Sequence, residues 1–202
     1  RADYPPTAVV CNPDKPVGRK QIITSPPVKK SILNLESSIK NKIEISQPET
    51  KEELIKISNQ LFQKADFGIV AAYSMIIPKE VIEKARLGII GVHPSLLPKY
   101  RGSSPIQSAI LAGEKEVGVS LFLMDEQLDH GPVIAEQKIT IDNLCSNSRE
   151  LENRLAEMSA ELLIKTLPNF VEGKITLLPQ DESQATYTKK YISEDGFIFP
   201  ED

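Results

Sequence analysis

The stretch FGIVAAYSMIIPKEVIEKARLGIIGV, residues 67–92, decides the fold class. It opens and closes with apolar runs, at 67–73 and 87–92, of the kind that form strands covered on both faces. Between these runs Pro78 favours the start of a helix, because its missing N–H would have no intrahelical partner in the first turn. A strand, a helix and a second strand in this order predict a right-handed crossover between parallel strands.

The same alternation extends toward the start of the chain. Residues 7–11 and 42–46 are expected to be strands. Helices are expected from residue 27 to about 38, and after residues 50–53, Thr-Lys-Glu-Glu, which match a capping box. The sequence therefore predicts an α/β protein with a Rossmann-like, doubly wound and mostly parallel sheet.

The pattern changes in the second half of the chain. Strands at 118–124 and 132–139 are separated by a polar loop, which predicts a hairpin-type addition at the sheet edge. Residues 148–171 carry Leu151, Leu155, Met158, Leu162 and Leu163 on one stripe, which predicts a long amphipathic helix interrupted late by Pro168. From Gln180 onward we expect a linker that leaves the domain.

Composition excludes several classes of protein. The 202 residues carry a formal net charge of −4, so any contact with nucleic acid must come from a local basic patch. Two cysteines, Cys11 and Cys145, and two histidines are too few for a disulfide framework or for most metal sites. No apolar run is long enough to span a membrane. We therefore expect a reduced, cytosolic setting, no metal and no membrane.

Residues that carry chemistry gather in two loops. The first, GVHPSLLPKYRG at 91–102, begins at the carboxyl end of an expected buried strand, where ligands bind in open α/β sheets. The second is DEQLDHGP at 125–132, and the two histidines, His93 and His130, lie in these loops. A carboxylate beside an imidazole orients it and stabilises a cation that can hold a developing oxyanion. Asp125 and Asp129 are both candidates, and spacing alone does not decide between them.

These loops, together with residues 105–107 and 118–119, resemble the signature of the folate-dependent formyltransferases, which move a formyl group from 10-formyltetrahydrofolate to an amine. Within this family, the chain is most similar to the branch that acts on initiator methionyl-tRNA, at residues 12–20, 25–29, 72–78 and 185–196. The resemblance covers nearly all of the chain. It implies the fold of the formyltransferase catalytic domain.

The resemblance also implies roles for individual residues. His93 and Asp129 fall on the catalytic histidine and aspartate, and the stretch that contacts tetrahydrofolate falls on Ser95, Leu96, Leu97 and Pro98. The co-substrate is then 10-formyltetrahydrofolate, and neither a metal nor a covalent enzyme intermediate is required. The implied partners are folate and initiator methionyl-tRNA, in the cytoplasm of a bacterium or an organelle. We expect a monomer.

The chain departs from the family pattern at Gly91, where the family has an asparagine that donates to the formyl oxygen. Losing one oxyanion donor costs roughly 10²–10³ in rate, so Gly91→Asn is expected to raise kcat far more than it changes folate affinity. The resemblance further divides the chain into a catalytic domain, 1–179, that lacks the family's first strand, and a linker, 180–202, toward a C-terminal β-barrel domain.

A basic segment near the start of the chain suggests a contact with tRNA. In the resembled branch an inserted basic loop reaches the acceptor arm, and Lys15, Arg19 and Lys20 fall in that loop; the alternative is an ordinary solvated surface. Two other functions stay open. One is a catalytically impaired relative that still binds folate, and the other is an enzyme that formylates an amino sugar.

Overall fold

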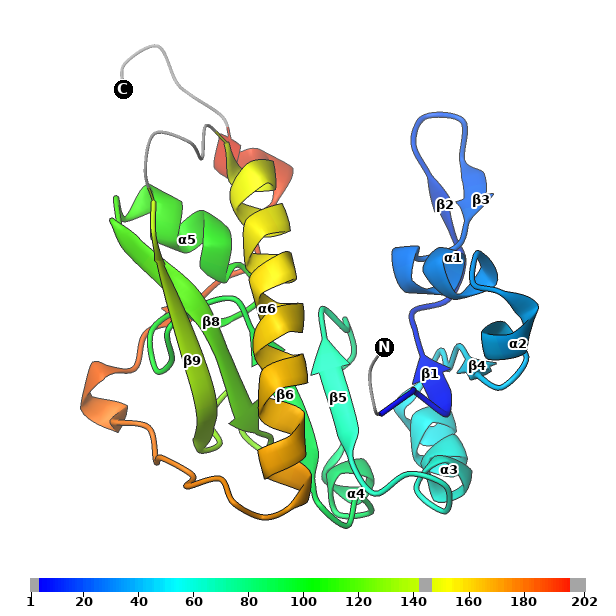
Figure 1. Ribbon diagram of the computed structural model, residues 1–202. Helices are drawn as coiled ribbons and strands as arrows, with labels where there is room; N and C mark the ends of the chain where they lie inside the picture. Colours follow the sequence, from blue (N-terminus) through cyan, green and yellow to red (C-terminus); the bar gives the residue numbers. More distant parts are fainter. Residues whose placement is uncertain (1–3, 142–146, 197–202) are drawn as a thin grey trace. The chain divides into compact units, whose positions relative to one another are not determined.

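The computed structural model describes residues 4–141 and 147–196 (Figure 1). Residues 142–146, which include Cys145, lie outside the described part of the chain. The chain forms two compact units, Arg1–Ile89 and Ile90–Asp202. Strands and helices alternate along the sequence, so the predicted α/β class is confirmed.

A parallel pair of strands lies in the first unit. β1 (Ala8–Val10) and β4 (Glu44–Ser46) run in the same direction, and the connection between them contains α1 (Pro27–Leu33) and α2 (Ser37–Lys40). The prediction of a single helix over 27–38 is therefore wrong. Asn34 caps α1 with its N–H on the carbonyl of Lys30, and α2 begins separately at Ser37. Asparagine and serine are weak helix formers, which favours a break at this point.

The expected crossover joins β5 (Gly68–Ala71) to β6 (Ile89–His93) through α4 (Lys79–Ile82). α3 (Lys51–Leu61) comes before β5 in the chain. The N–H of Leu87 donates to the carbonyl of Asp66 at 2.8 Å, and the N–H of Gly68 donates to the carbonyl of Gly88 at 3.2 Å. The two chain segments therefore run in the same direction, as a crossover requires.

The predicted capping box is present at the start of α3. Thr50 Oγ1 accepts the N–H of Glu53 at 3.2 Å, and the Glu53 carboxylate accepts the N–H of Glu49 at 2.7 Å. Both bonds satisfy backbone donors that have no partner inside the helix.

Three antiparallel strands form the sheet of the second unit. β6 pairs with β8 (Glu116–Leu123), and β8 pairs with β9 (Val133–Thr140). β8 and β9 are the hairpin that the sequence predicts. The register places His93 opposite Ser120 and Gly91 opposite Phe122. Since opposed residues project to the same face of a sheet, these four residues share one face.

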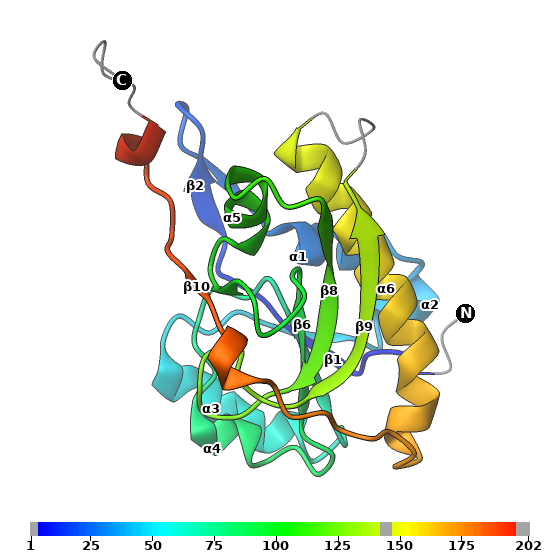
Figure 2. The same ribbon diagram turned by 90° about the vertical axis from the view of Figure 1, so that its left-hand side faces the viewer.

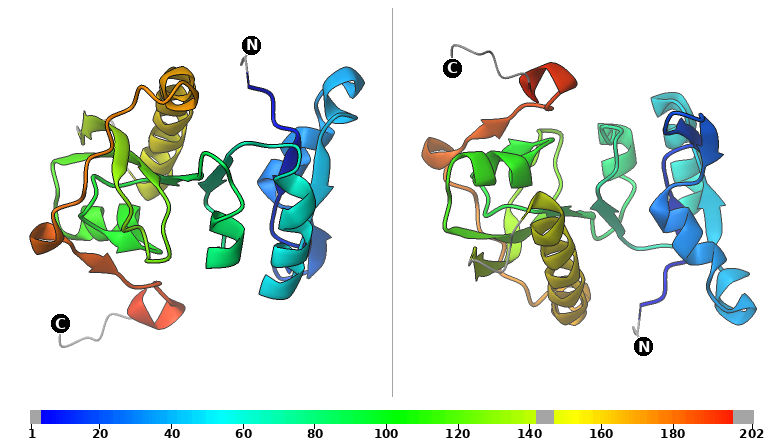
Figure 3. Two further views of the ribbon diagram at one scale, coloured as in Figure 1. Left: turned by 90° about the horizontal axis from the view of Figure 1, so that it is seen from below. Right: turned by 90° about the horizontal axis from the view of Figure 1, so that it is seen from above.

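α6 (Ser148–Val171) runs along β8 and β9 (Figures 1 and 3). Its predicted stripe is buried at four positions, Leu151, Leu155, Met158 and Leu162. The helix continues through Pro168 to Val171, so the predicted interruption is wrong. The proline lies in the last turn, where it removes a single backbone bond and leaves the rest of the helix intact.

The segment after α6 pairs with strands of the second unit. β10 (Tyr187–Thr188) pairs in parallel with β7 (Arg101–Gly102), and Leu178 bridges to Val133. Figure 2 shows this segment, orange to red, passing the ends of β8 and β9 on its way from α6 to β10. The short turn η1 (Glu182–Gln184) lies between α6 and β10, and a second turn, η2 (Ser193–Gly196), follows β10. These residues therefore contact the fold, where the sequence suggests a linker; a further domain beyond them stays a prediction.

Candidate active site

His93 is the last residue of β6 and is held from both ring nitrogens. Its side chain is buried, with the residue only 6% exposed. Nε2 lies 2.8 Å from the backbone carbonyl of Tyr100. Because a carbonyl can only accept, Nε2 carries a proton in this bond. Nδ1 is the other ring nitrogen, and it faces the carboxylate of Asp129 with Nδ1 and Oδ2 3.6 Å apart.

Asp129 comes from the loop between β8 and β9. Its Oδ2 also accepts the N–H of Gly102 at 2.8 Å, so the carboxylate joins the two loops that the sequence singled out. Asp125 lies elsewhere in the same loop, with its Oδ2 2.6 Å from Nδ1 of His130. The structure therefore places Asp129, and not Asp125, beside His93.

Close backbone packing fixes the shape of the 125–131 loop. Asp129 adopts a left-handed backbone conformation, with φ of 48°, which non-glycine residues rarely adopt. A β-carbon on Gly131 would lie 1.8 Å from the carbonyl oxygen of Leu123, so only glycine fits there. This approach brings Asp129 back toward the end of the sheet that carries His93.

The expected folate-contacting stretch, Ser95 to Pro98, is fixed against β8. Ser95 Oγ donates to the carbonyl of Lys99 at 2.6 Å, and Ser120 Oγ accepts the N–H of Leu97 at 3.0 Å. Leu97 is joined to Pro98 by a cis peptide bond and packs in a buried apolar cluster with Phe122 and Val133. The stretch thus follows His93 directly and is anchored in the core of the second unit through Leu97.

Gly91 lies on the same face of the sheet as His93, two residues before it. A β-carbon on Gly91 would lie 2.3 Å from Cε1 of Phe122, a side chain that is 2% exposed. The space in which a larger residue at position 91 would stand is filled by this aromatic ring.

Tyr100, whose carbonyl accepts the bond from His93, has a left-handed backbone conformation with φ of 60°. Its phenol donates to Glu114 at 2.8 Å. Burial, together with this hydrogen bond and the negative charge of Glu114, raises the pKa of Tyr100 to about 12. The hydrogen bonds from Tyr100 and Lys99 lower the pKa of Glu114. The phenol is therefore a fixed neutral donor, and it holds the residue whose carbonyl orients His93.

The sequence analysis did not assign a role to the polar cluster behind these loops. Arg101 is fully buried, and its guanidinium bonds to Gln180, to both carboxylate oxygens of Glu182 and to the hydroxyl of Tyr187. The hydrogen bond to Glu182 raises the pKa of Arg101 and lowers that of Glu182. The position of Arg101 inside the 91–102 loop was the one sequence signal that could have pointed to this cluster. No sequence pattern around Gln180 indicates that it belongs to it.

The expected tRNA-contacting residues lie in the first unit on an antiparallel hairpin, β2 (Lys15–Val17) and β3 (Ile22–Thr24). The hairpin is drawn in blue in Figure 1. Lys15, Arg19 and Lys20 are exposed on it. The turn is closed by a bond from the N–H of Gln21 to the carbonyl of Gly18. The segment is thus an ordered hairpin that presents three cations to solvent.

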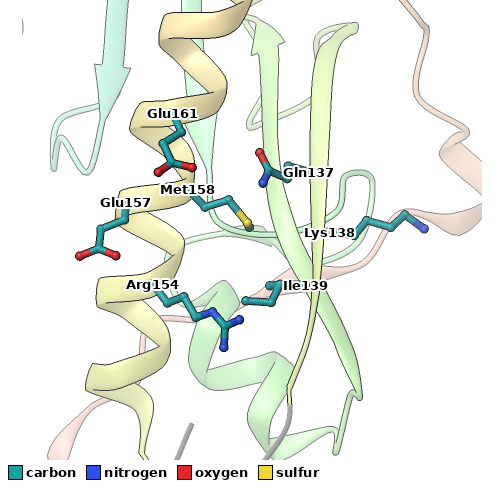
Figure 4. A pocket seen from close by; sticks show the side chains of 7 residues that line it. All are labelled: Gln137, Lys138, Ile139, Arg154, Glu157, Met158 and Glu161. Carbon is teal, nitrogen blue, oxygen red and sulfur yellow. The ribbon is translucent and has the colours of Figure 1, made fainter. Parts of the chain in front are cut away.

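A cavity of about 290 Å³ lies elsewhere in the second unit, between β9 and α6 (Figure 4). It is lined by Gln137, Lys138, Ile139, Arg154, Glu157, Met158 and Glu161. None of these residues belongs to the His93 site. In the described part of the chain, no three His, Cys, Asp or Glu side chains are grouped to hold a metal ion. Among the described helices, none is long and apolar enough to cross a membrane.

Comparison with known proteins identifies relatives over most of the chain. Residues 5–167 match the model of the formyl transferase family. A methionyl-tRNA formyltransferase of Listeria monocytogenes is 40% identical over 95% of this chain and 59% of its own length. One from Staphylococcus aureus is 37% identical over 98% of this chain and 61% of its own length. The chain therefore spans about three fifths of these relatives.

The fold is shared with solved formyltransferases. The crystal structure of PseJ from Anoxybacillus kamchatkensis, solved with a formamido sugar nucleotide and tetrahydrofolate, has a TM-score of 0.61 at 23% identity. The alignment covers 90% of this chain and 84% of that chain. Together with the match over residues 5–167, this likeness leads to one conclusion: the chain belongs to the formyl transferase family.

Proposed function

We propose that this chain is the catalytic part of an enzyme that transfers the formyl group of 10-formyltetrahydrofolate to the amino group of initiator methionyl-tRNA. The observation that carries the proposal is the pair of buried His93 and half-buried Asp129, which lies inside the region matched by the family. The names of the relatives that are 37–40% identical support methionyl-tRNA as the acceptor. We further propose that the protein acts in the cytoplasm as a monomer.

The residues around His93 suit a folate. The stretch that follows His93 is held in place, with Leu97 packed in the core against Phe122 and Val133 and Ser95 bonded to the carbonyl of Lys99. A stretch fixed in this way beside an imidazole and a carboxylate can offer its backbone polar groups to a ligand. We propose Ser95, Leu96, Leu97 and Pro98 as the folate contacts, and the tetrahydrofolate in the PseJ structure supports this choice of ligand.

Bound 10-formyltetrahydrofolate would supply a formyl carbon that the amine attacks, with loss of the bond from that carbon to the folate nitrogen. The chain then has two tasks. His93, with Nε2 bonded to the carbonyl of Tyr100, presents a proton on Nδ1 that can stabilise the oxygen on which negative charge develops. Asp129 faces the same nitrogen and stabilises the imidazolium, which carries a proton on both ring nitrogens. It can also assist transfer of the proton that the attacking amine loses to the folate nitrogen, which needs a proton as it leaves.

We propose Lys15, Arg19 and Lys20 as phosphate contacts for the tRNA. The chain as a whole is acidic, with a net charge of −4, so binding to a polyanion depends on a local patch of this kind. The protruding hairpin offers three cations within six residues of chain.

Release of tetrahydrofolate from 10-formyltetrahydrofolate, measured with the full-length protein and different acceptors, tests the proposal. Release that depends on initiator methionyl-tRNA supports it. Release that depends on a nucleotide-linked amino sugar, and not on the tRNA, identifies the amino-sugar enzyme instead. Folate binding without release in the presence of either acceptor identifies the catalytically impaired relative.

A further inference from the structure

Asp129 adopts a left-handed backbone conformation, with φ of 48°, which few non-glycine residues adopt. The loop supplies two constraints of its own, the close approach of Gly131 to Leu123 and the contact between Asp125 and His130. Neither contact bonds to the backbone carbonyls of Asp129 and Gly131.

Gln180 supplies the missing contacts. Its Nε2 donates to the carbonyl of Asp129 at 2.9 Å and to the carbonyl of Gly131 at 2.8 Å. A single amide group thus uses both of its hydrogens on the carbonyls of the residues before and after His130. It comes from a segment 51 residues further along the chain, after α6 (Figure 2).

Arg101 fixes which way the Gln180 amide points. The guanidinium donates to Gln180 Oε1 from Nε at 3.1 Å and from Nη2 at 2.7 Å. Since a guanidinium can only donate, the oxygen end of the amide must face Arg101 and the NH₂ end must face the loop. Arg101 is itself fully buried and bound by the carboxylate of Glu182 at 2.5 Å.

The same stretch of backbone reaches the reacting pair. The carbonyl of Tyr100 accepts from His93, and the N–H of Gly102 donates to the Asp129 carboxylate. Arg101 lies between Tyr100 and Gly102 in the chain, and its guanidinium donates to the Gln180 oxygen. Gln180 therefore holds the backbone of Asp129 from one side while the neighbours of Arg101 hold the side chains of His93 and Asp129 from the other.

We propose that Gln180 is a positioning residue for Asp129: through its two bonds to the 129–131 backbone it sets the distance between the Asp129 carboxylate and His93. It does not touch the substrates. This role rests on the proposed function, because the effect of Gln180 on kcat is measured as a change in the rate of formyl transfer.

Two substitutions separate the bonds that Gln180 makes. In Gln180→Glu the carboxylate still accepts from Arg101, but it cannot donate to the carbonyls of Asp129 and Gly131. Gln180→Met keeps the length of the side chain and removes both sets of bonds. We expect kcat to fall about 10- to 100-fold in both variants, since displacement of a catalytic group by about 1 Å costs up to about 10². KM for 10-formyltetrahydrofolate should stay within about twofold.

The matched control is Gln60→Glu, an exposed glutamine on α3 in the first unit. It introduces the same charge and should leave kcat unchanged. A double-mutant cycle adds a readout that a general loss of stability would not give. If Gln180 acts through Asp129, Gln180→Met should lower kcat much less in an Asp129→Asn background than in the wild type. Full additivity of the two losses would overturn the inference.

Crystal structures of the wild type and Gln180→Met test positioning whether or not the protein transfers a formyl group. We expect the left-handed φ of Asp129 to be lost and its separation from His93 Nδ1 to exceed the present 3.6 Å. An unchanged loop refutes the positioning role. By contrast, a wild-type protein that releases no folate with any acceptor refutes the proposed function, while the loop geometry still decides the role of Gln180.

Discussion

The ring of Phe122 occupies the space beside the α-carbon of Gly91 across the β6–β8 pair. A β-carbon at position 91 would lie 2.3 Å from Cε1 and 2.4 Å from Cζ of that ring. Phe122 is buried among Leu97 and Val133, so its ring has little room to move. This packing changes what a substitution at Gly91 is expected to do.

Gly91→Asn should destabilise the protein instead of restoring an oxyanion donor. Overpacking of a buried site costs about 1–3 kcal/mol in free energy of unfolding, and the added amide would compete with the Phe122 ring. Chemical denaturation measures this loss. Gly91→Asn combined with Phe122→Leu should recover part of it, and only that double variant has space to place the amide beside His93. Gly196→Asn, at an exposed position where an added β-carbon meets nothing within 4 Å, is the control that should cost little. A gain in kcat from Gly91→Asn alone would contradict this prediction, because it would show that the Phe122 ring moves aside to admit the new side chain.

His93→Asn should lower kcat by about 10²–10⁴, the range for loss of a group that moves or holds a proton in the transition state. The chain has two histidines, so His130→Asn is the matched control. His130 lies against Asp125 and Glu182, and its loss should cost much less. Steady-state rates with methionyl-tRNA compare the two. Equal losses would mean that the loop as a whole matters and His93 has no special role.

Arg101→Lys should destabilise the second unit although it keeps the charge. A lysine ammonium cannot replace the planar guanidinium that reaches both Gln180 and Glu182. The Gln180 oxygen would then lose its donors, at a cost of about 1–3 kcal/mol in free energy of unfolding. Urea denaturation gives the value, and Lys56→Arg on the exposed face of α3 is a control for the exchange of cation type. Unchanged stability would mean that another donor reaches Gln180.

The contribution of Glu182 to stability should depend on pH. The hydrogen bond from Arg101 holds the pKa of Glu182 below its ordinary value of 4.5. Because the folded-state pKa is the lower one, the stabilisation is fully present above pH 4.5 and is lost as the pH falls through the folded-state pKa. The difference in free energy of unfolding between the wild type and Glu182→Gln should therefore shrink below pH 4.5. Denaturation curves at neutral and acidic pH check this, and a constant difference would contradict it.

Removal of the three cations on the β2–β3 hairpin should weaken tRNA binding most at low salt. With Lys15, Arg19 and Lys20 changed to alanine, the slope of log affinity against log salt should fall by about 0.7–0.9 for each lost phosphate contact. The control changes Lys42, Lys51 and Lys56, which are exposed in the same unit and carry the same total charge. If both triple variants reduce the slope equally, net charge matters and the hairpin makes no specific contact.

Local sequence patterns determined most of the elements. Apolar runs located β5 and β6, the capping box located the start of α3, and the leucine stripe located α6 from Ser148 to Val171. Each of these signals acts within a few residues, where backbone propensity and burial on one face decide the outcome. The failures were local as well: the helix expected at 27–38 ends at Leu33 and a second one begins at Ser37, and a late Pro168 did not end α6.

The sequence also predicted His93 and the 125–132 loop as parts of one site, but only the tertiary structure decided how they meet. The choice of Asp129 over Asp125 depends on a left-handed turn and on the approach of Gly131 to Leu123. Gln180 reaches that turn from 51 residues away, and Phe122 fills the space beside Gly91 from the neighbouring strand. Such contacts depend on three-dimensional packing between distant segments, and no periodicity or spacing along the chain encodes them.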